Sequence, residues 1–289
     1  MIARVAAALL AAAALAANAP PEQDPPKQEA EPITIGASHR LTTHDYERRI
    51  NVLVPPGYHA SDKNYPLVVM LDGGTSQDLF LQFGVHRWNQ LWQRSEEAII
   101  VGVETVNRQR ELLPLSGNAE EAKLYPLHGQ SDQFRTWLKD EVLPLVRNTY
   151  RHDGRAILIG ESAAGHFVAE TWVIEPELFD GYAALSPSLQ WDDQSLSNEP
   201  VLSEAKDRPP LFLSLANEGG GTEEGVLRFT RSAKDPVCFA DRRGTHVRHS
   251  NSLHQLLPEA LQFLLPTKAD WLEEYGLTAR CQMTGPEGS

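Results

Sequence analysis

Residues 156–165 have the sequence AILIGESAAG, and residues 163–174 continue the chain as AAGHFVAETWVI. The apolar run 156–159 predicts a strand that is buried on both faces, and the segment after Ser162 has the length and composition of a helix. Small residues at Gly160, Ala164 and Gly165 allow the strained turn that lifts a serine hydroxyl above a sheet, in front of a helix N-terminus. This stretch therefore predicts strand, turn and helix, with Ser162 as a nucleophile.

The motif departs from the usual G-x-S-x-G pattern at one position. Ala164 stands where the second glycine is expected, and Gly165 follows one residue later. A Gly-x-Ser sequence in front of a helix is also a common N-cap. The motif by itself does not choose between an N-cap and a nucleophile, so the remainder of the chain has to decide.

Further apolar runs alternate with segments of helical period along the chain. The runs predict strands at 48–54, 67–71, 98–103, 182–185 and 211–215, and the three- and four-residue spacing of apolar residues predicts helices at 134–146, 163–174 and 253–265. Alternation of this kind is typical of the α/β class, in which a mostly parallel central sheet is covered by helices on both faces.

Composition narrows the function classes. The chain has 289 residues, which suits one catalytic domain, and its 41% hydrophobic and 22% charged content is that of a globular protein. The 26 Lys and Arg against 39 Asp and Glu give a net charge of −13, which opposes nucleic-acid binding. We therefore expect no nucleic-acid partner.

The N-terminal residues predict export. Arg4 precedes the apolar run 5–17, and small residues follow, as in a signal peptide over residues 1–19 whose cleavage point the sequence leaves open. Residues 20–32 form a Pro/Glu-rich tether, and 33–289 form the catalytic domain. No later segment reaches the roughly 18 uncharged apolar residues of a membrane span. The mature chain is expected to be periplasmic or secreted, with an uncleaved N-terminal anchor as the alternative.

The chain has two cysteines, Cys238 and Cys281. Export allows them to form a disulfide that tethers the C-terminal tail. The sequence does not fix their separation in space, so pairing and two free thiols both remain open.

Five blocks in order resemble the α/β-hydrolase esterase family that holds trilactone siderophore esterases, S-formylglutathione hydrolase, feruloyl esterases and mycolyltransferases. The blocks are 52–58 (VLVPPGY), 65–73 (YPLVVMLDG), 101–104 with 107–111 (VGVE and NRQRE), 160–165 (GESAAG) and 185–188 (LSPS). They span residues 45–265 approximately, and the greatest likeness is to the siderophore-esterase-like branch. The resemblance implies an α/β-hydrolase fold with a catalytic Ser162.

The resemblance also implies an acid and a base, in the chain order serine, acid, histidine. Glu218 follows the predicted strand 211–215, where the family carries its acid, with Glu223 and Glu224 as rivals. His249 reproduces the family's spacing between the catalytic histidine and the last helix, whereas His246 would require about three inserted residues. Together with His254, these histidines also raise the question of a metal site, but no acid or cysteine lies nearby at ligand spacing, so no metal is expected.

Two backbone N–H groups are expected to form an oxyanion hole: that of Ala163, after the nucleophile, and that of Gly73 or Gly74, after the strand 67–71. The resemblance places the Arg108 side chain towards the substrate pocket, and an ion pair with Glu111 or Glu104 is an equal alternative.

These residues together predict a serine carboxylic ester hydrolase that acts through a Ser-His-acid triad and an acyl-enzyme, without a cofactor. The resemblance points to lactone, siderophore or aryl esters. An acyltransferase with the same triad is an alternative, and so is a catalytically inactive binding protein, which Ala164 motivates. The sequence does not predict an oligomeric state.

Overall fold

The computed structural model describes residues 30–42, 47–198, 202 and 207–284. The chain divides into two units, Met1–Thr34 and Ile35–Ser289, and the second contains all the elements described below. The predicted signal peptide at 1–19 and most of the predicted tether at 20–32 lie outside the described residues. Among the described helices, none is long and apolar enough to cross a membrane.

The described strands form one mixed sheet, in the order β1-β2-β4-β3-β5-β6-β7-β8-β9. The strands are β1 (Gly36–Thr42), β2 (Glu47–Leu53), β3 (Tyr65–Leu71), β4 (Ile99–Val103), β5 (His152–Glu161), β6 (Gly181–Leu185), β7 (Leu211–Leu215), β8 (Val237–Asp241) and β9 (Gln282–Thr284). The six central strands from β4 to β8 run parallel to one another, and β1, β2 and β9 pair antiparallel at the two sides.

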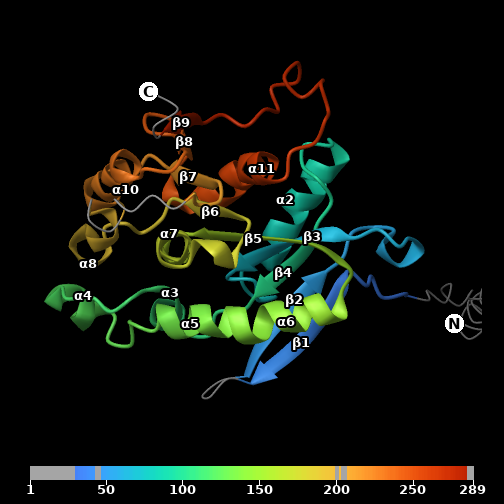
Figure 1. The fold of residues 1–289 in the computed structure, drawn as a ribbon, viewed down its shortest axis with the longest axis horizontal. Coiled ribbons are helices and arrows are strands. Elements are labelled where there is room, and N and C mark those ends of the chain that lie inside the picture. Colours follow the sequence, from blue (N-terminus) through green and yellow to red (C-terminus); the bar gives the residue numbers. More distant parts are fainter. Residues whose placement is uncertain (1–29, 43–46, 199–201, 203–206, 285–289) are drawn as a thin grey trace, which may run out of the picture. The chain divides into compact units, whose positions relative to one another are not determined.

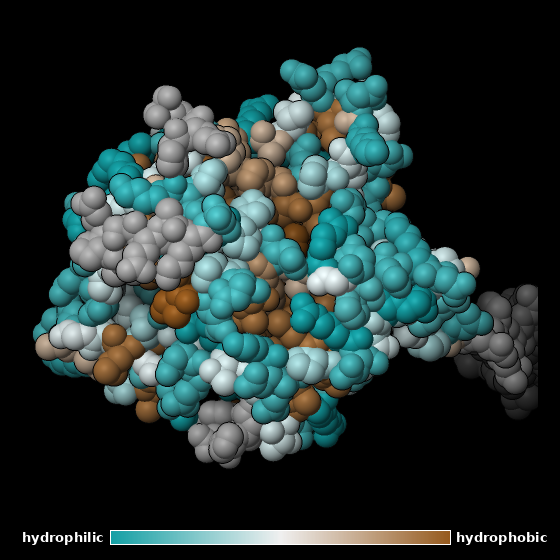
Figure 2. Space-filling view, in the orientation of Figure 1, coloured by the Kyte–Doolittle hydropathy of each residue, from teal (hydrophilic) through white to brown (hydrophobic). Residues whose placement is uncertain are grey.

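Helices cover both faces of this sheet (Figure 1). The α-helices are α2 (Leu79–Leu91), α3 (Arg108–Leu112), α4 (Ala119–Leu124), α5 (Ser131–Trp137), α6 (Leu143–Thr149), α7 (Ala163–Ile174), α8 (Trp191–Gln194), α10 (Gly220–Ser232) and α11 (Ser252–Leu264). A π-helical turn, Leu138–Val142, joins α5 to α6, and short 3₁₀ turns lie at Tyr58–Ala60, Pro176–Leu178, Ser195–Ser197 and His249–Asn251. Helices α2 and α11 pack together on one face, and hydrophobic residues are visible around them at the surface (Figure 2).

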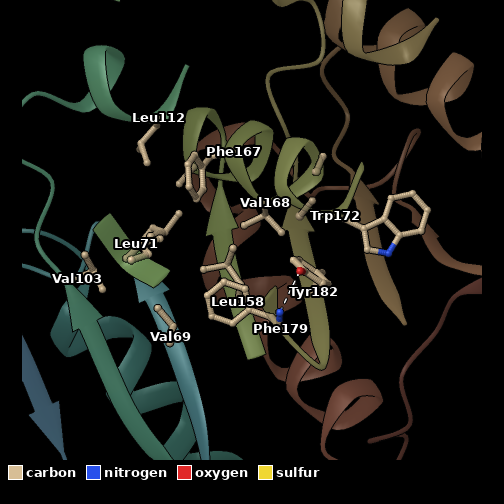
Figure 3. Packing of buried hydrophobic residues seen from close by; sticks show 14 of the residues in the cluster. Val69, Leu71, Val103, Leu112, Leu158, Phe167, Val168, Trp172, Phe179 and Tyr182 are labelled. Atoms are coloured by element: carbon tan, nitrogen blue, oxygen red, sulfur yellow. Dashed lines mark hydrogen bonds between the residues drawn. The ribbon is translucent and has the colours of Figure 1, made fainter. Parts of the chain in front are cut away.

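Alternation along the central strands divides the core between the two faces. In β3, Leu67, Val69 and Leu71 point to the face covered by α5, α6 and α7, whereas Val68 and Met70 point to the face covered by α2 and α11. On the first face, Phe167 and Val168 of α7 lie over Leu71 and Leu158 (Figure 3). Because β3 is buried on both faces, its sequence is a continuous apolar run instead of an alternating one.

The predicted α/β class, with a mostly parallel sheet between two helical layers, is confirmed. Strand β7 and helix α7 have the predicted bounds, and the predicted helix 134–146 forms the middle of the helical stretch 131–149. Strand β5 begins four residues earlier than the apolar run that predicted it, because its exposed N-terminal half, from His152, pairs with β3 at Tyr65.

Cys238 and Cys281 form a disulfide, with their Cα atoms 5.3 Å apart. Cys238 is buried in β8, and Cys281 immediately precedes β9. Of the two possibilities that the sequence left open, a disulfide and two free thiols, the structure has the disulfide. The bond closes a loop of 43 residues between β8 and the C-terminal strand.

Replacing Cys281 with serine is expected to lower the free energy of unfolding by about 2–4 kcal/mol. A loop of this length restricts the unfolded chain strongly, and the chain-entropy estimate for it is about 4 kcal/mol. Equilibrium unfolding in guanidinium chloride measures the difference, and reducing the unaltered protein with a thiol provides the matched control. An unchanged denaturation midpoint in both samples would show that the bond does not stabilise the folded chain.

Candidate active site

Ser162 occupies a strained turn between β5 and α7. Its φ of 61° and ψ of −120° are rare for a residue with a side chain. A Cβ atom on Gly160 would lie 2.5 Å from the Ala164 carbonyl oxygen, and one on Gly165 would lie 2.9 Å from that of Leu185. Both glycines are therefore required by close packing. Ala164 itself is fully buried, so the departure from the usual motif leaves the turn intact.

Three side chains from separate elements form a continuous hydrogen-bonded chain. The Ser162 Oγ lies 2.9 Å from Nε2 of His249, and Nδ1 of His249 lies 2.8 Å from Oε1 of Glu218. Ser162 precedes α7, Glu218 follows β7, and His249 begins the 3₁₀ turn before α11. With Nδ1–H donating to the carboxylate, Nε2 is the nitrogen that can accept the serine proton.

The rival residues are engaged elsewhere. Glu223 pairs with Arg243 at 3.0 Å, and Glu224 accepts a hydrogen bond from Gln194. His246 is exposed, and its carbonyl oxygen accepts a hydrogen bond from Asn251. The structure therefore brings Glu218 and His249 to Ser162 and leaves the alternatives outside this cluster.

The electrostatics around His249 favour its protonated form. Its pKa is raised, chiefly by the hydrogen bond to Glu218 and further by the charge of Glu161, while burial and Arg108 act in the opposite direction. The Glu218 side chain, which accepts the hydrogen bond from His249, is only 9% exposed and is therefore little screened by water. An imidazolium formed at this position would be stabilised by two carboxylates.

Glu161 is a second carboxylate beside His249 that the sequence analysis did not assign. Its Oε1 lies 3.8 Å from Nε2 of His249 and accepts a hydrogen bond from the Ser252 hydroxyl at 2.7 Å. Burial raises the pKa of Glu161, and the Ser252 hydrogen bond partly opposes that rise. The sequence feature that could have identified Glu161 is its position in the Gly-Glu-Ser motif, directly before the nucleophile turn.

Arg108 lines the cavity above Ser162, as the resemblance implied, and it is also ion-paired. Its Nε donates to Oδ2 of Asp72 at 2.9 Å, and Nη2 donates to the Glu161 carbonyl oxygen at 2.9 Å. The partner is neither of the two predicted acids, because Glu111 pairs with Arg48 and Glu104 accepts the Arg49 N–H. Arg108 thus joins the loop after β3 to the residue before the nucleophile.

The prediction of Gly73 or Gly74 as an oxyanion donor is not supported. The Gly73 N–H donates to the Val103 carbonyl oxygen at 2.8 Å, and the Gly74 N–H donates to the Gln77 side chain at 2.9 Å. A Cβ on Gly73 would lie 2.3 Å from Cα of Gly102, so this glycine serves the close approach of β3 and β4. Ala163 does line the cavity, and as the first residue of α7 its N–H has no acceptor within the helix.

The cavity above Ser162 has a volume of about 460 Å³, within the range of small-molecule sites. Apolar and polar side chains share its wall: Leu113, Tyr125 and Trp191 with Gln109, Gln190, Asn217 and Thr222. Trp191 is fixed by a hydrogen bond from its Nε1 to the Pro114 carbonyl oxygen and by ring contacts with Tyr125 and His128. Trp88 lines a different groove. Within the described residues, no three His, Cys, Asp or Glu side chains gather as metal ligands would.

Comparison with known proteins identifies the family of the chain. Residues 42–235 match the model of the Esterase family, described as "Putative esterase". The chain belongs to the Esterase family. It is a carboxylic ester hydrolase.

Two relatives from Bacillus subtilis are similar in sequence to this esterase. The uncharacterized protein YbbA is 21% identical over 234 residues, which are 75% of this chain and 92% of YbbA. The ferri-bacillibactin esterase BesA is 28% identical over 95 residues, 32% of this chain and 30% of BesA. Among solved structures, an IroE-like serine hydrolase from Shewanella oneidensis superposes with a TM-score of 0.70 at 23% identity, over 80% of each chain. The α/β-hydrolase fold implied by the resemblance is thereby confirmed.

Proposed function

We propose that this esterase is a serine hydrolase in which Ser162 is the nucleophile, His249 the general base and Glu218 the acid that orients the base. The observation that carries the proposal is the hydrogen-bonded chain from Ser162 Oγ through both nitrogens of His249 to Glu218. The strained φ of Ser162 supports it, because such a conformation is costly and is found preferentially at functional sites.

The arrangement supports a two-step reaction. His249 Nε2 takes the Ser162 proton as Oγ attacks the ester carbonyl carbon, and the same proton then passes to the alcohol oxygen as its bond to carbon breaks. Water, deprotonated by His249, attacks the resulting acyl-enzyme, and the carboxylic acid leaves as Ser162 recovers its proton. The carboxylates of Glu218 and Glu161 stabilise the imidazolium in both steps.

We propose that the oxyanion of each tetrahedral intermediate accepts hydrogen bonds from the Ala163 N–H and from the guanidinium of Arg108. The Gly73 and Gly74 N–H groups are occupied, whereas Arg108 lines the cavity and is a third exposed. Its two hydrogen bonds, to Asp72 and to the Glu161 backbone, use only part of its five N–H groups and hold it rigidly.

Replacing Arg108 with methionine is expected to lower kcat about 10²- to 10³-fold, with a smaller change in KM, because one oxyanion donor is lost. Steady-state hydrolysis of p-nitrophenyl butyrate measures this, and circular dichroism shows whether the variant is folded. A folded variant with unchanged kcat would mean that backbone amides alone hold the oxyanion.

The acidic limb of the pH profile should report His249. As a base His249 must be neutral, so kcat/KM falls as the pH drops through its raised pKa. Three charged groups face it: Glu218, Glu161 and Arg108. Glu161→Gln removes one negative charge, which lowers the pKa of His249 and moves the acidic limb to lower pH. Glu223 is ion-paired with Arg243 away from the site, so Glu223→Gln should leave the pH profile unchanged. An acidic limb that does not move in Glu161→Gln would show that the charge of Glu161 does not affect the pKa of His249.

We propose that the substrates are lactone or aryl esters, with siderophore lactones as one candidate. The mixed apolar and polar wall of the cavity, with Tyr125 and Trp191, suits an aromatic or cyclic ester. The likeness to BesA supports a siderophore substrate. An assay with an added alcohol or sugar acceptor separates hydrolysis from acyl transfer.

The primary test is covalent labelling. A fluorophosphonate should add once per chain, and the peptide that gains its mass should contain Ser162. Absence of both labelling and ester turnover would exclude a working serine site. We also propose export to the periplasm or medium, which the Cys238–Cys281 disulfide supports because such bonds persist in oxidising compartments.

A further inference from the structure

Helix α2 is oriented with its polar residues inward. The residues it buries are Leu79, Gln82, His86 and Asn89, whereas Phe80 is 54%, Trp88 40% and Leu91 77% exposed. An ordinary surface helix has the opposite arrangement. The outer face of α2 therefore exposes several large apolar side chains.

The inward polar residues have structural partners, so the orientation is fixed. Gln82 donates to the Leu71 carbonyl oxygen at 3.0 Å, and Asn89 donates to the carbonyl oxygen of Pro258 in α11 at 2.9 Å. Rotating the helix to hide its apolar face would break these buried hydrogen bonds, which is costly. Helix α2 is thus held with Phe80, Leu81 and Trp88 facing outward.

A groove of about 540 Å³ lies between this face and α11. Its wall is mainly apolar and also includes one arginine; the residues are Phe80, Leu81, Gly84, Val85, Trp88, Arg94, His254, Gln255 and Pro258. None of them lines the cavity above Ser162. Hydrophobic residues are visible in this region of the surface, around α2 and α11 (Figure 2).

Arg94 places a positive charge in the groove, and Glu259 is a nearby carboxylate whose charge favours the Arg94 cation. Only 6% of the residue is exposed, its Nε donates to Gln262 at 2.9 Å, and its guanidinium lies 5.9 Å from the Trp88 ring centre. Within the described residues no carboxylate forms an ion pair with it; the nearby Glu259 pairs with Arg242. A buried, unpaired cation is costly, so an anion from outside the chain would be bound favourably here.

The local charge supports the same conclusion. Residues 79–95 include Arg87 and Arg94 and no Asp or Glu, although the whole chain has a net charge of −13. The residues that line the groove include Arg94 and no Asp or Glu, so the lining itself favours a negatively charged ligand.

We propose that the groove between α2 and α11 binds a single-chain anionic amphiphile, a long-chain carboxylate. Its head group accepts hydrogen bonds from the terminal nitrogens of Arg94, and its hydrocarbon chain lies along Trp88, Leu81 and Phe80. A bilayer surface fits less well, because an arginine that is only 6% exposed cannot reach lipid head groups. The groove volume is within the range of known ligand sites. The site is separate from the ester chemistry and does not depend on it.

Calorimetric titration of the full chain with dodecanoate, below its micelle-forming concentration, tests the proposal. We expect saturable binding of one dodecanoate per chain. Dodecanol, which has no carboxylate, should bind about tenfold more weakly than dodecanoate. Arg94→Met, which has no guanidinium, should bind dodecanoate about tenfold more weakly than the unaltered protein does, because the charged hydrogen bond is lost in both cases. Trp88→Ala should also weaken binding. Unchanged p-nitrophenyl butyrate hydrolysis shows that these variants are folded.

Two arginines provide matched controls. Arg87→Met alters a neighbouring cation of α2 that does not line the groove, and Arg108→Met alters the cation of the Ser162 cavity. Both should bind dodecanoate within twofold of the unaltered protein. The proposal is overturned by absence of binding, by equal affinity in Arg94→Met, by loss of binding in Arg108→Met, or by binding to anionic vesicles only. A dimer in sedimentation that dissociates in Trp88→Glu would show instead that a second copy covers the groove.

Discussion

Replacing His249 with alanine is expected to lower kcat for p-nitrophenyl butyrate about 10⁴- to 10⁶-fold, and Ser162→Ala should have an effect of similar size. The two side chains act as a unit, since a serine hydroxyl without its base is a very weak nucleophile at neutral pH. For the same reason the double variant should be little worse than either single one. Steady-state hydrolysis by the purified protein, after circular dichroism has confirmed folding, measures all three.

His246→Ala is the matched control for His249. It alters an exposed histidine three residues away, and its turnover should remain within about twofold of the unaltered protein. If His246→Ala abolished turnover and His249→Ala did not, the base would be His246, and the 2.9 Å contact between Ser162 and His249 would not be the catalytic one.

Replacing Glu218 with glutamine is expected to lower kcat about 10²- to 10⁴-fold with little change in KM. A neutral amide can donate to Nδ1 of His249 and then stabilises the wrong imidazole tautomer, which leaves no acceptor facing Ser162. It also removes the main cause of the raised pKa of His249. Steady-state kinetics at saturating substrate measures the loss in kcat.

Glu161→Gln and Glu223→Gln identify which carboxylate orients His249. Glu161 faces Nε2 and not Nδ1, so its loss should move the pH profile and reduce kcat much less than the loss of Glu218. Glu223→Gln should have no effect. A larger loss of kcat in Glu161→Gln than in Glu218→Gln would reverse the two roles.

The centre of the fold could be predicted from sequence because burial leaves a strong pattern there. Strands β3, β4, β6 and β7 are covered on both faces, so each is an apolar run whose predicted ends differ from the observed ones by at most two residues. Helix α7 was predicted at its observed bounds, since it starts at the turn that the glycines require.

The borders of the sheet gave no such signal. Strand β1 is mostly exposed, and its sequence GASHRLT has no apolar period, while β9 has only three residues. Helix α2 was missed for a different reason: its buried face is largely polar, so a search for an apolar stripe on one side fails. In each case tertiary contacts, and not local sequence, determine the element.

The candidate site divides in a similar way. The resemblance to the esterase family implied Ser162, Glu218 and His249, and the structure brings these three side chains together. Gly73 was wrongly assigned because the sequence does not show that its N–H is already bonded to Val103. The partner of Arg108 was missed because Asp72 lies thirty-six residues away in sequence.

Strand β9 covers the outer side of β8 and so limits strand pairing between separate molecules. Gln282, Met283 and Thr284 pair with the outer side of β8, a short strand in which Val237, Cys238 and Phe239 are apolar. Without β9, β8 would present unpaired N–H and C=O groups to any other extended chain, which is how sheets recruit neighbours into aggregates. Cys281 holds β9 in place from the preceding residue. The disulfide therefore helps to keep the three-residue β9, and not the more apolar β8, at this edge of the sheet.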